Sequence, residues 1–291
     1  PLIGGENVFT FGAIGHLTCL DRRSGRLKWK VDVRAEHNAA MPIWGYGSSP
    51  VLVGDLVVVQ AGIRPGGTIA AFDRKTGQLR WKVLDDRPGY STPVLRTVEG
   101  VRQLIVWTAD AAWGLAPDTG AVIWKFPFRT SNYDVAIISP VLEAGRLFVS
   151  GYWDGAATAK VEKSGAKPSW TAKVPANLMS TPLWRAGHLY TLDRRQGVLC
   201  VRWDDGEVLW SDEHRITARD RNPHAYFVWA GEKAVFLNAE GELGLAEFSP
   251  EGMRDLGRAR VIGPTWAPPG FAGQDVFARD DREIVAVRIL Q

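Results

Sequence analysis

The side chains that could support chemistry in this sequence are isolated acids and amides. Asp134 and Glu36 could act as bases, and together with Asn132 and Asn177 they offer oxygen atoms of the kind that bind Ca²⁺. They form no spaced motif, and the chain contains neither a Gly-x-Ser-x-Gly nucleophile turn nor a His-x-x-x-His pair. The residues alone therefore predict no catalytic group, no metal site and no cofactor.

Histidine and cysteine give no stronger metal or redox signal. The histidines fall at unrelated positions, and the stretch 211–224 holds His214 and His224 at a spacing that is not diagnostic of a metal site. Cys19 and Cys200 lie far apart in the chain, and no Cys-x-x-Cys-His haem motif is present. We expect both cysteines to be reduced, buried and structural.

Composition limits the classes of partner. The chain has 291 residues and a formal net charge of +3, with its Lys and Arg residues dispersed, so we expect no nucleic-acid binding. No apolar run reaches the roughly 18 residues of a membrane helix, so no membrane span is expected. The chain starts at Pro1 and contains no signal peptide, so the sequence itself names no compartment. We expect a monomer.

Aromatic residues in the connecting segments are the stronger candidates for a binding role. Segments 30–47, 125–137 and 211–224 are long and do not repeat. Aromatic side chains beside polar ones in loops favour recognition of a protein or small ligand, because rings supply contact area at low entropic cost. The same rings could instead staple the loops to the sheets. The candidate binding residues are Trp44, Tyr46, Tyr90, Tyr133, Asp134 and Trp266, of which we expect Trp44, Tyr46 and Tyr133 to be partly exposed around one concavity.

A repeated hairpin positions these loops. The stretch from Ala71 to Trp81 contains Asp-x-x-Thr-Gly-x-x-x-Trp, and similar stretches recur along the chain. Each is typical of a strand, a tight turn with Gly at positive φ, and a second strand. The Trp positions are Trp29, Trp81, Trp124, Trp170 and Trp210, with Leu256 in a sixth copy. Six residues before the turn Gly stand the small residues Cys19, Ala71, Gly114, Ala159 and Cys200, which we expect to face the Trp of an adjacent repeat.

A second glycine marks the period of the repeat. Seven such glycines, each between two short apolar runs, are 42 to 49 residues apart by subtraction of their numbers. About four short strands fit in that length, as in one blade of a β-propeller. We therefore predict an all-β propeller of four-stranded antiparallel blades, with residues 1–291 as a single domain. Seven repeats are present, which leaves open a seven-bladed ring or an eight-bladed ring lacking its N-terminal blade. The glycines are Gly5, Gly54, Gly100, Gly145, Gly187, Gly231 and Gly273.

The Asp-x-x-[Ser/Thr]-Gly-x-x-x-Trp pattern resembles the PQQ-like propeller repeat, the tryptophan-docking motif of quinoprotein dehydrogenases. The stretches Trp44–Pro50 and Tyr133–Ala136 are similar to PQQ-binding-like β-propeller repeat proteins. The resemblance implies that each Trp docks on the small residue and peptide plane of a neighbouring blade. It also implies a periplasmic or otherwise extracytoplasmic location.

The resemblance leaves three functions open, since one fold serves several activities. The first is a non-catalytic scaffold or binding module whose working face carries the long loops. The second is an oxidoreductase that uses pyrroloquinoline quinone (PQQ) with Ca²⁺, and the third is a BamB-like platform for outer-membrane assembly. Alcohol-oxidising members of the quinoprotein group typically carry two adjacent cysteines, which this chain lacks. We therefore favour the non-catalytic module, with no cofactor, and leave enzymatic activity open.

Overall fold

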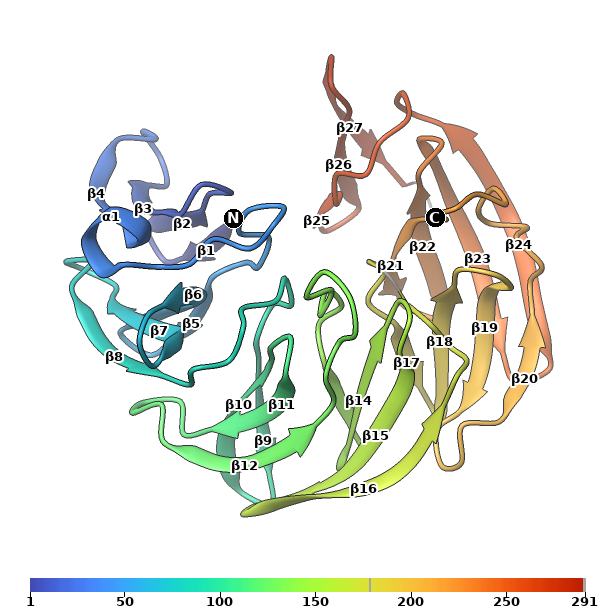
Figure 1. Cartoon of the computed structure of the whole chain (residues 1–291). Coiled ribbons are helices and arrows are strands. Elements are labelled where there is room, and N and C mark those ends of the chain that lie inside the picture. The colour runs from blue at the N-terminus through green and yellow to red at the C-terminus, as the bar shows by residue number, and fades with distance from the viewer. Residues whose placement is uncertain (178, 290–291) are drawn as a thin grey trace. The chain divides into compact units, whose positions relative to one another are not determined.

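The computed structural model describes residues 1–177 and 179–289, and over these residues the regular secondary structure is almost entirely β (Figure 1). The helix in this range is α1 (Val33–His37), and the other regular elements are short strands. The strands form seven sheets, six of four strands and one of three, each built from strands that are consecutive in the chain. The predicted fold class, a β-propeller with seven repeats, is confirmed.

The chain divides into two compact units, Pro1–Thr171 and Ala172–Gln291. The expectation of one domain over residues 1–291 stays a prediction. The first unit contains sheets one to four. Their strands are β1 (Leu2–Gly4), β2 (Asn7–Phe11), β3 (His16–Asp21) and β4 (Leu27–Asp32); β5 (Val51–Val53), β6 (Leu56–Ile63), β7 (Gly67–Asp73) and β8 (Leu79–Val83); β9 (Val94–Val98), β10 (Val101–Trp107), β11 (Ala111–Leu115) and β12 (Val122–Pro127); β13 (Val141–Glu143), β14 (Arg146–Gly151), β15 (Gly155–Glu162) and β16 (Gly165–Ala172).

The second unit contains sheets five to seven. Their strands are β17 (Leu183–Arg185), β18 (His188–Asp193), β19 (Gly197–Arg202) and β20 (Val208–Ser211); β21 (Ala225–Ala230), β22 (Lys233–Asn238), β23 (Glu242–Ser249) and β24 (Gly252–Arg260); β25 (Gly270–Ala272), β26 (Asp275–Arg279) and β27 (Ile284–Arg288). Each unit has its own apolar core, formed between successive sheets.

The repeated turn is fixed by its Asp and its Gly. In sheet two the Asp73 carboxylate accepts hydrogen bonds from the backbone N–H of Lys75 and Thr76, both at 2.9 Å. Gly77 closes the turn by donating its N–H to the Asp73 carbonyl at 2.8 Å, with φ at +75°. A residue with a Cβ adopts this left-handed conformation only at a cost, so the position favours glycine. The motif thus specifies the loop that joins the third and fourth strands.

The Trp that follows the turn docks on the same turn of the next sheet. The Trp29 indole N–H donates to the Arg74 carbonyl at 3.1 Å, and a Cβ built on Gly77 would lie 2.8 Å from the Trp29 ring. Trp210 repeats the contact in the second unit, where its indole N–H donates to the Ser249 carbonyl at 2.8 Å. These bonds join sheet one to sheet two and sheet five to sheet six, whereas the Trp124 indole N–H donates to Gln103 of its own sheet at 2.7 Å.

The predicted neighbour of the small residue is wrong. Cys19 pairs directly with Trp29 of its own sheet, and Ala71 pairs in the same way with Trp81. Gly114 is paired with Trp124, whose ring occupies the space that a Cβ would need. The small side chain therefore lets the Trp of the same repeat fold across the sheet before it reaches the next one. Trp124 is buried, whereas Trp29, Trp81, Trp170 and Trp210 remain partly exposed.

Sheet six departs from this pattern. The sequence alignment sets Leu256 at the Trp position, but the residue paired with Ala246 is Asp255. The Asp255 carboxylate accepts a hydrogen bond from the Arg258 guanidinium at 2.5 Å. The hairpin of this repeat has a two-residue loop, because Ser249 pairs directly with Gly252. Sheet six therefore presents no aromatic ring at this position.

Both cysteines lie at the small position of their sheets. Cys19 is 1% exposed, Cys200 is fully buried, and neither forms a disulfide. This confirms that they are buried and unpaired. Burial raises the pKa of the Cys200 thiol to about 11, so the reactive thiolate is scarce at neutral pH.

Candidate functional site

Three exposed aromatic side chains form a continuous row in the first unit. Trp44 lies in the connection between sheets one and two, Tyr133 in the connection between sheets three and four, and Trp153 in the turn between β14 and β15. Their exposed fractions are 58%, 56% and 41%. The ring centroids of Trp44 and Tyr133 are 5.7 Å apart, and those of Tyr133 and Trp153 are 5.8 Å apart. We call these three residues the aromatic row.

Two buried tyrosines support the row from below. Tyr90 lies 5.7 Å from Trp44 between centroids, and its hydroxyl accepts a hydrogen bond from the Trp44 backbone N–H at 3.3 Å. Burial raises the pKa of Tyr90, which keeps the phenol protonated. Tyr152 contacts Trp153 edge to face at 4.5 Å. Because two rings of the row rest on buried neighbours, the surface is held in place.

Tyr46 does not belong to the exposed surface, which corrects the expectation from the sequence. Its side chain is only 4% exposed, its ring packs on Phe11 at 4.8 Å, and its hydroxyl donates to the Ala40 carbonyl at 3.2 Å. Its backbone N–H donates to the Ala13 carbonyl, which turns the side chain inward. Tyr46 staples the connection to sheet one, and burial raises its pKa to about 12.

A four-residue charge cluster lies beside the aromatic row. The Arg87 guanidinium donates to Asp110 at 2.8 and 3.2 Å and also binds the Asp134 carboxylate. Arg129 approaches Asp110 at 3.5 Å but keeps 73% of its side chain exposed. Burial would raise the pKa of Asp110, but hydrogen bonds from Arg87 outweigh it and lower that pKa. We call Arg87, Asp110, Asp134 and Arg129 the charge cluster.

The backbone at the centre of the site is strained. Tyr133 and Asp134 are consecutive non-glycine residues in the left-handed region, with φ of 54° and 56°. Such residues cost on the order of 1–3 kcal/mol each and persist only where surrounding contacts impose them. Here Arg87 binds the Asp134 side chain, and the Tyr90 N–H donates to the Ala136 carbonyl at 2.7 Å. The ring of Tyr133 lies next to those of both tryptophans, with centroids 5.7 Å from Trp44 and 5.8 Å from Trp153.

The charge cluster does not fit a Ca²⁺–quinone centre. Asp110 and Asp134 are already bridged by the Arg87 guanidinium, which supplies the positive charge that a Ca²⁺ ion would. Within residues 1–177 and 179–289, no three His, Cys, Asp or Glu side chains come together as a metal site would require. Asn132 is exposed, and its side-chain amide donates to the Ser131 hydroxyl at 3.2 Å.

The other acid and amide candidates have structural partners. Glu36 accepts a hydrogen bond from the Asp32 backbone N–H at 2.8 Å, which caps the start of α1. Asn177, in the second unit, is fully buried and donates to the Thr191 hydroxyl at 2.5 Å. Neither residue lies in the aromatic row or the charge cluster.

Trp266, in the second unit, is 54% exposed, and its carbonyl accepts a hydrogen bond from the Tyr226 hydroxyl at 3.3 Å. His224 packs edge to face on Tyr226 at 4.5 Å and is 1% exposed, with no hydrogen-bond partner for either ring nitrogen among the described residues. His214 contacts the Thr217 hydroxyl at 3.2 Å. A binding role for Trp266 stays a prediction.

Sequence reasoning missed Trp153, Arg87 and Asp110. Trp153 follows Tyr152 in a short segment between two glycines. A large aromatic ring is unusual in so short a turn, so this pattern could have predicted an exposed binding residue. Arg87 and Asp110 carried no signal, because they are 23 residues apart and belong to no motif.

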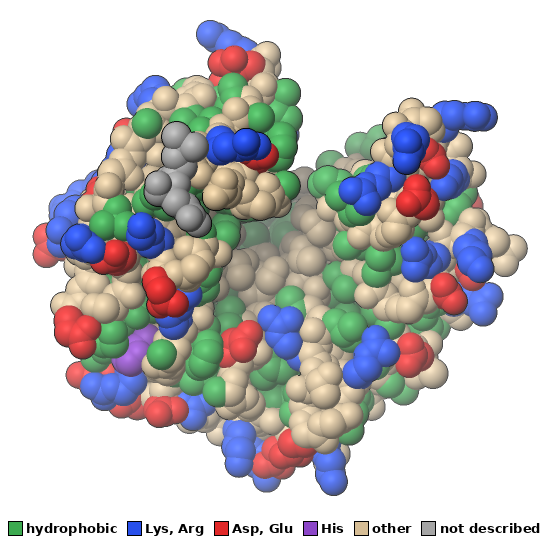
Figure 2. Space-filling view, turned by 180° about the vertical axis from the view of Figure 1, so that it is seen from behind, with side chains coloured by type: hydrophobic (Ala, Val, Ile, Leu, Met, Phe, Trp, Pro, Cys, Tyr) green, Lys and Arg blue, Asp and Glu red, His purple; other side chains and the backbone are tan. Residues whose placement is uncertain are grey.

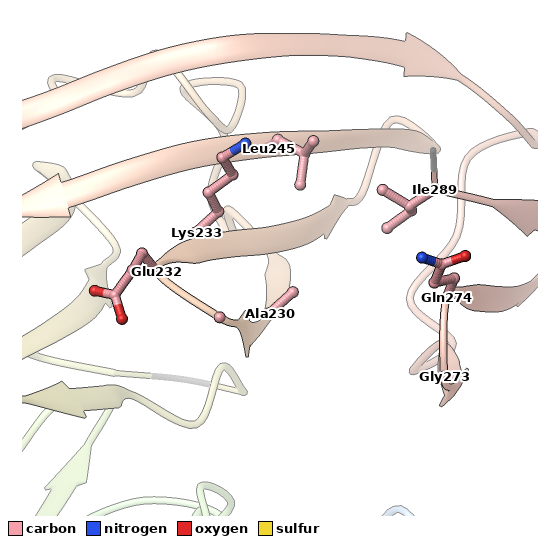
Figure 3. A pocket seen from close by; sticks show the side chains of 8 residues that line it. Ala230, Glu232, Lys233, Leu245, Gly273, Gln274 and Ile289 are labelled. Atoms are coloured by element: carbon pink, nitrogen blue, oxygen red, sulfur yellow. The ribbon is translucent and has the colours of Figure 1, made fainter. Parts of the chain in front are cut away.

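A pocket of about 510 Å³ lies elsewhere, in the second unit (Figure 3). Ile289 is equivalent to Arg74, since its N–H donates to the Gln274 carbonyl as that of Arg74 donates to the Asp55 carbonyl. Arg74 is the residue on which Trp29 docks. The pocket therefore marks the place where sheet six supplies no docking ring, and we assign it no ligand. Its lining residues are Ala230, Gly231, Glu232, Lys233, Leu245, Gly273, Gln274 and Ile289.

Two general properties of the surface bear on partners. Lys and Arg side chains are intermixed with Asp and Glu over the face in view in Figure 2, so no block of one sign stands out there. Among the residues that the structure describes, no helix is long and apolar enough to cross a membrane.

Comparison with known proteins places the chain among PQQ-like propellers. The sequence profile of the family described as "Outer membrane protein assembly factor BamB" matches residues 1–212 and 110–252. Quinohemoprotein alcohol dehydrogenase ADH-IIG of Pseudomonas putida is 24% identical over 236 residues, which cover 72% of this chain and 31% of that enzyme. The chain thus spans less than a third of that curated relative.

Solved structures share the fold. BamB from Moraxella catarrhalis superposes with a TM-score of 0.70 at 18% identity, over 97% of this chain and 79% of that one. A europium-containing methanol dehydrogenase superposes with a TM-score of 0.61 at 10% identity, over 90% of this chain and 68% of that one. Structural similarity at such low sequence identity establishes the fold alone, because one fold supports several activities.

Proposed function

Since the chain belongs to the family described as outer membrane protein assembly factor BamB, we propose that it is a non-catalytic binding module that recognises a partner protein through the aromatic row. The description of the family also supports a location outside the cytoplasm, as the repeat motif implies. A role as an assembly platform is one form of this function.

The exposure of the aromatic row carries the proposal. Trp44, Tyr133 and Trp153 leave between two fifths and three fifths of their surface in water, whereas Tyr46 is buried. Adjacent exposed rings mark interaction surfaces, and Trp and Tyr are enriched among the residues that dominate binding energy. The buried tyrosines and the constrained backbone restrict the aromatic row before it binds, which reduces the conformational entropy that its side chains lose on binding.

The quinone-dependent oxidoreductase ranks behind this proposal. The partial match to a quinohemoprotein alcohol dehydrogenase favours it. Against it, the paired carboxylates of the charge cluster are held by Arg87, and the two cysteines are buried in different sheets.

Site-specific photo-crosslinking tests the proposal. A photoreactive phenylalanine analogue replaces Trp153 in one variant and Val122 in another, since Val122 is 48% exposed on β12, outside the site. After irradiation in the native host, we expect a discrete protein adduct from position 153 and none from position 122. The Trp44→Ala/Tyr133→Ala double variant should weaken the adduct without loss of folding.

Equal adducts from both positions would contradict a specific face. A dye-linked alcohol oxidation assay after addition of PQQ and Ca²⁺ separates the alternatives further. Turnover that depends on Asp134 would make the oxidoreductase the better description.

A further inference from the structure

We propose that the aromatic row binds an uncharged, proline-rich segment of the partner in the polyproline II conformation. The inference rests on the proposed binding function and names the chemistry of the ligand.

The polar groups of the row are mainly hydrogen-bond donors. The indole N–H groups of Trp44 and Trp153 and the hydroxyl of Tyr133 have no hydrogen-bond partner among the residues that the structure describes. An indole N–H donates and cannot accept. The complementary ligand is therefore rich in acceptors and poor in donors. Proline has no backbone N–H, and a polyproline II segment makes no internal hydrogen bonds, so its carbonyls are free to accept.

Charge points to an uncharged ligand. The charge cluster contains two guanidinium groups, on Arg87 and Arg129, and two carboxylates, on Asp110 and Asp134, so its charges cancel. A cationic ligand would have to displace the Arg87 guanidinium from Asp110 or Asp134 to gain a partner. An anionic ligand would have to compete with Asp110 for the exposed Arg129. A chain of proline and apolar residues would leave the ion pairs of the charge cluster intact, because its carbonyls require only the hydrogen-bond donors of the aromatic row.

Two other ligand classes fit less well. A glycan also stacks on aromatic rings, but its hydroxyl groups donate as well as accept. The carboxylates that could receive those donors, Asp110 and Asp134, are held by Arg87. An added β-strand needs a free sheet edge, whereas Trp44 and Tyr133 come from connections and Trp153 from a turn.

The shape of the row matches one turn of polyproline II. Adjacent rings are tilted by 46° and 49°, which makes a ridged surface instead of a flat one. The centroid distances of 5.7 and 5.8 Å place the outer rings at most about 11.5 Å apart. One turn of polyproline II rises roughly 9 Å over three residues, so about four residues span the row. Domains that bind such segments also use aromatic-lined surfaces.

Peptide binding to the purified full chain tests the inference. The probe is a fluorescently labelled, capped decaproline, and the control is a capped Gly-Ser peptide of equal length; fluorescence anisotropy gives the affinities. We expect saturable decaproline binding and at least tenfold weaker binding of the Gly-Ser peptide. Trp44→Ala and Trp153→Ala should each reduce the decaproline affinity at least tenfold. Leu27→Ala, which changes an exposed residue of β4 away from the row, should leave it within twofold.

A conservative variant separates hydrogen bonding from stacking. Trp153→Phe keeps a ring but removes the N–H donor, and we expect a three- to tenfold loss of decaproline affinity. Affinity equal to that of the unmodified chain would overturn the donor argument.

The outcome also distinguishes this inference from the proposed function. A protein adduct from position 153 without decaproline binding would overturn the proline-rich ligand and leave the binding module intact. Loss of both would count against the proposed function. Stronger binding of a neutral oligosaccharide such as cellohexaose would assign the row to a glycan and overturn the inference.

Discussion

His224 is the residue whose burial has the clearest consequence for stability. Its imidazole is 1% exposed, and burial lowers its pKa from 6.5 to about 4. Between those values the unfolded chain binds a proton that the folded chain does not, so stability falls as the pH drops from about 6.5 toward 4. Above pH 6.5 the imidazole is neutral in both states, and its contribution no longer changes. The loss across that window amounts to about 3 kcal/mol.

Urea unfolding between pH 7 and pH 4.5 measures this effect. Carboxylates also begin to titrate toward the lower limit, so the measurement needs a variant that shares them and lacks only the imidazole. His224→Phe keeps a ring on Tyr226 and removes the titrating group. We expect the variant to lose markedly less stability over this range than the unmodified chain. Parallel pH curves for the two proteins would show that His224 does not titrate as its burial implies.

Single residues also show where sequence reasoning stops. Trp44 and Tyr46 are two residues apart in one connection, and both resemble binding residues, yet the first is exposed and the second is buried. The difference arises from the bond between the Tyr46 N–H and the Ala13 carbonyl, a contact that no local pattern encodes. Arg87 reaches Asp134 across 47 residues. The aromatic character of the site and the candidate Asp134 could be predicted, but the partners of Asp134 in the charge cluster could not.

At the scale of elements, the turn glycines test the docking of one sheet on the next. Gly77 and Gly25 occupy the same turn position with φ of +75° and +69°, so Ala at either costs about 1–2 kcal/mol for the backbone. A Cβ at Gly77 would also lie 2.8 Å from Trp29, whereas nothing lies within 4 Å of one at Gly25. Such a clash adds about 1–3 kcal/mol.

Gly77→Ala should therefore destabilise the chain by about 2 kcal/mol more than Gly25→Ala in urea unfolding. Because Gly25 and Gly77 occupy the same turn position, the backbone cost is the same in both variants. The difference between their free energies of unfolding therefore reports the clash with Trp29. Similar losses in the two variants would mean that the sheets accommodate the extra methyl group.

The connection between sheets three and four depends on Arg87. In Arg87→Gln the carboxylate of Asp134 loses its partner, so the strained backbone at Tyr133 and Asp134 should open more often. We expect global stability to change by only about 1 kcal/mol, because these ion pairs are partly exposed. Amide exchange of Ala136, whose N–H donates to the Asp134 carbonyl at 2.8 Å, should become at least several-fold faster.

Arg129→Gln is the control for this experiment, since Arg129 is 73% exposed and, within the charge cluster, contacts only Asp110, at 3.5 Å. Its exchange rate at Ala136 should match that of the unmodified chain. If Arg87→Gln left that rate unchanged, the left-handed pair would be held by other contacts.

The elements themselves were largely predictable. Gly77 and its equivalents mark the turns, and the Trp residues mark the fourth strands, because both depend on local chemistry that each repeat contains. Sheet six was aligned one residue out, since Asp255 pairs with Ala246 where Leu256 was expected. The motif predicts the position of the Trp by its spacing from the turn Gly. That spacing does not reveal that Ser249 pairs directly with Gly252, so the pairing of Asp255 could not be predicted.

At the scale of the whole molecule, the cysteines report on how the repeats unfold. Cys19 lies in the first unit and Cys200 in the second, both buried and unpaired, so each thiol reacts only when its surroundings open. In repeat architectures stability is approximately a sum of terms within repeats and between neighbours. We therefore expect the two units to open separately.

Trp81→Ala tests this expectation, because it removes a large partly buried ring of the first unit and should cost about 3–5 kcal/mol. A loss of about 3 kcal/mol corresponds to roughly a hundredfold increase in the open population. Thiol labelling followed by peptide mass spectrometry should then show Cys19 reacting up to a hundredfold faster, with the Cys200 rate within about twofold of its original value. The same acceleration at both cysteines would instead mean that the stability removed at Trp81 is shared by all seven sheets, so that the repeats unfold as one cooperative body.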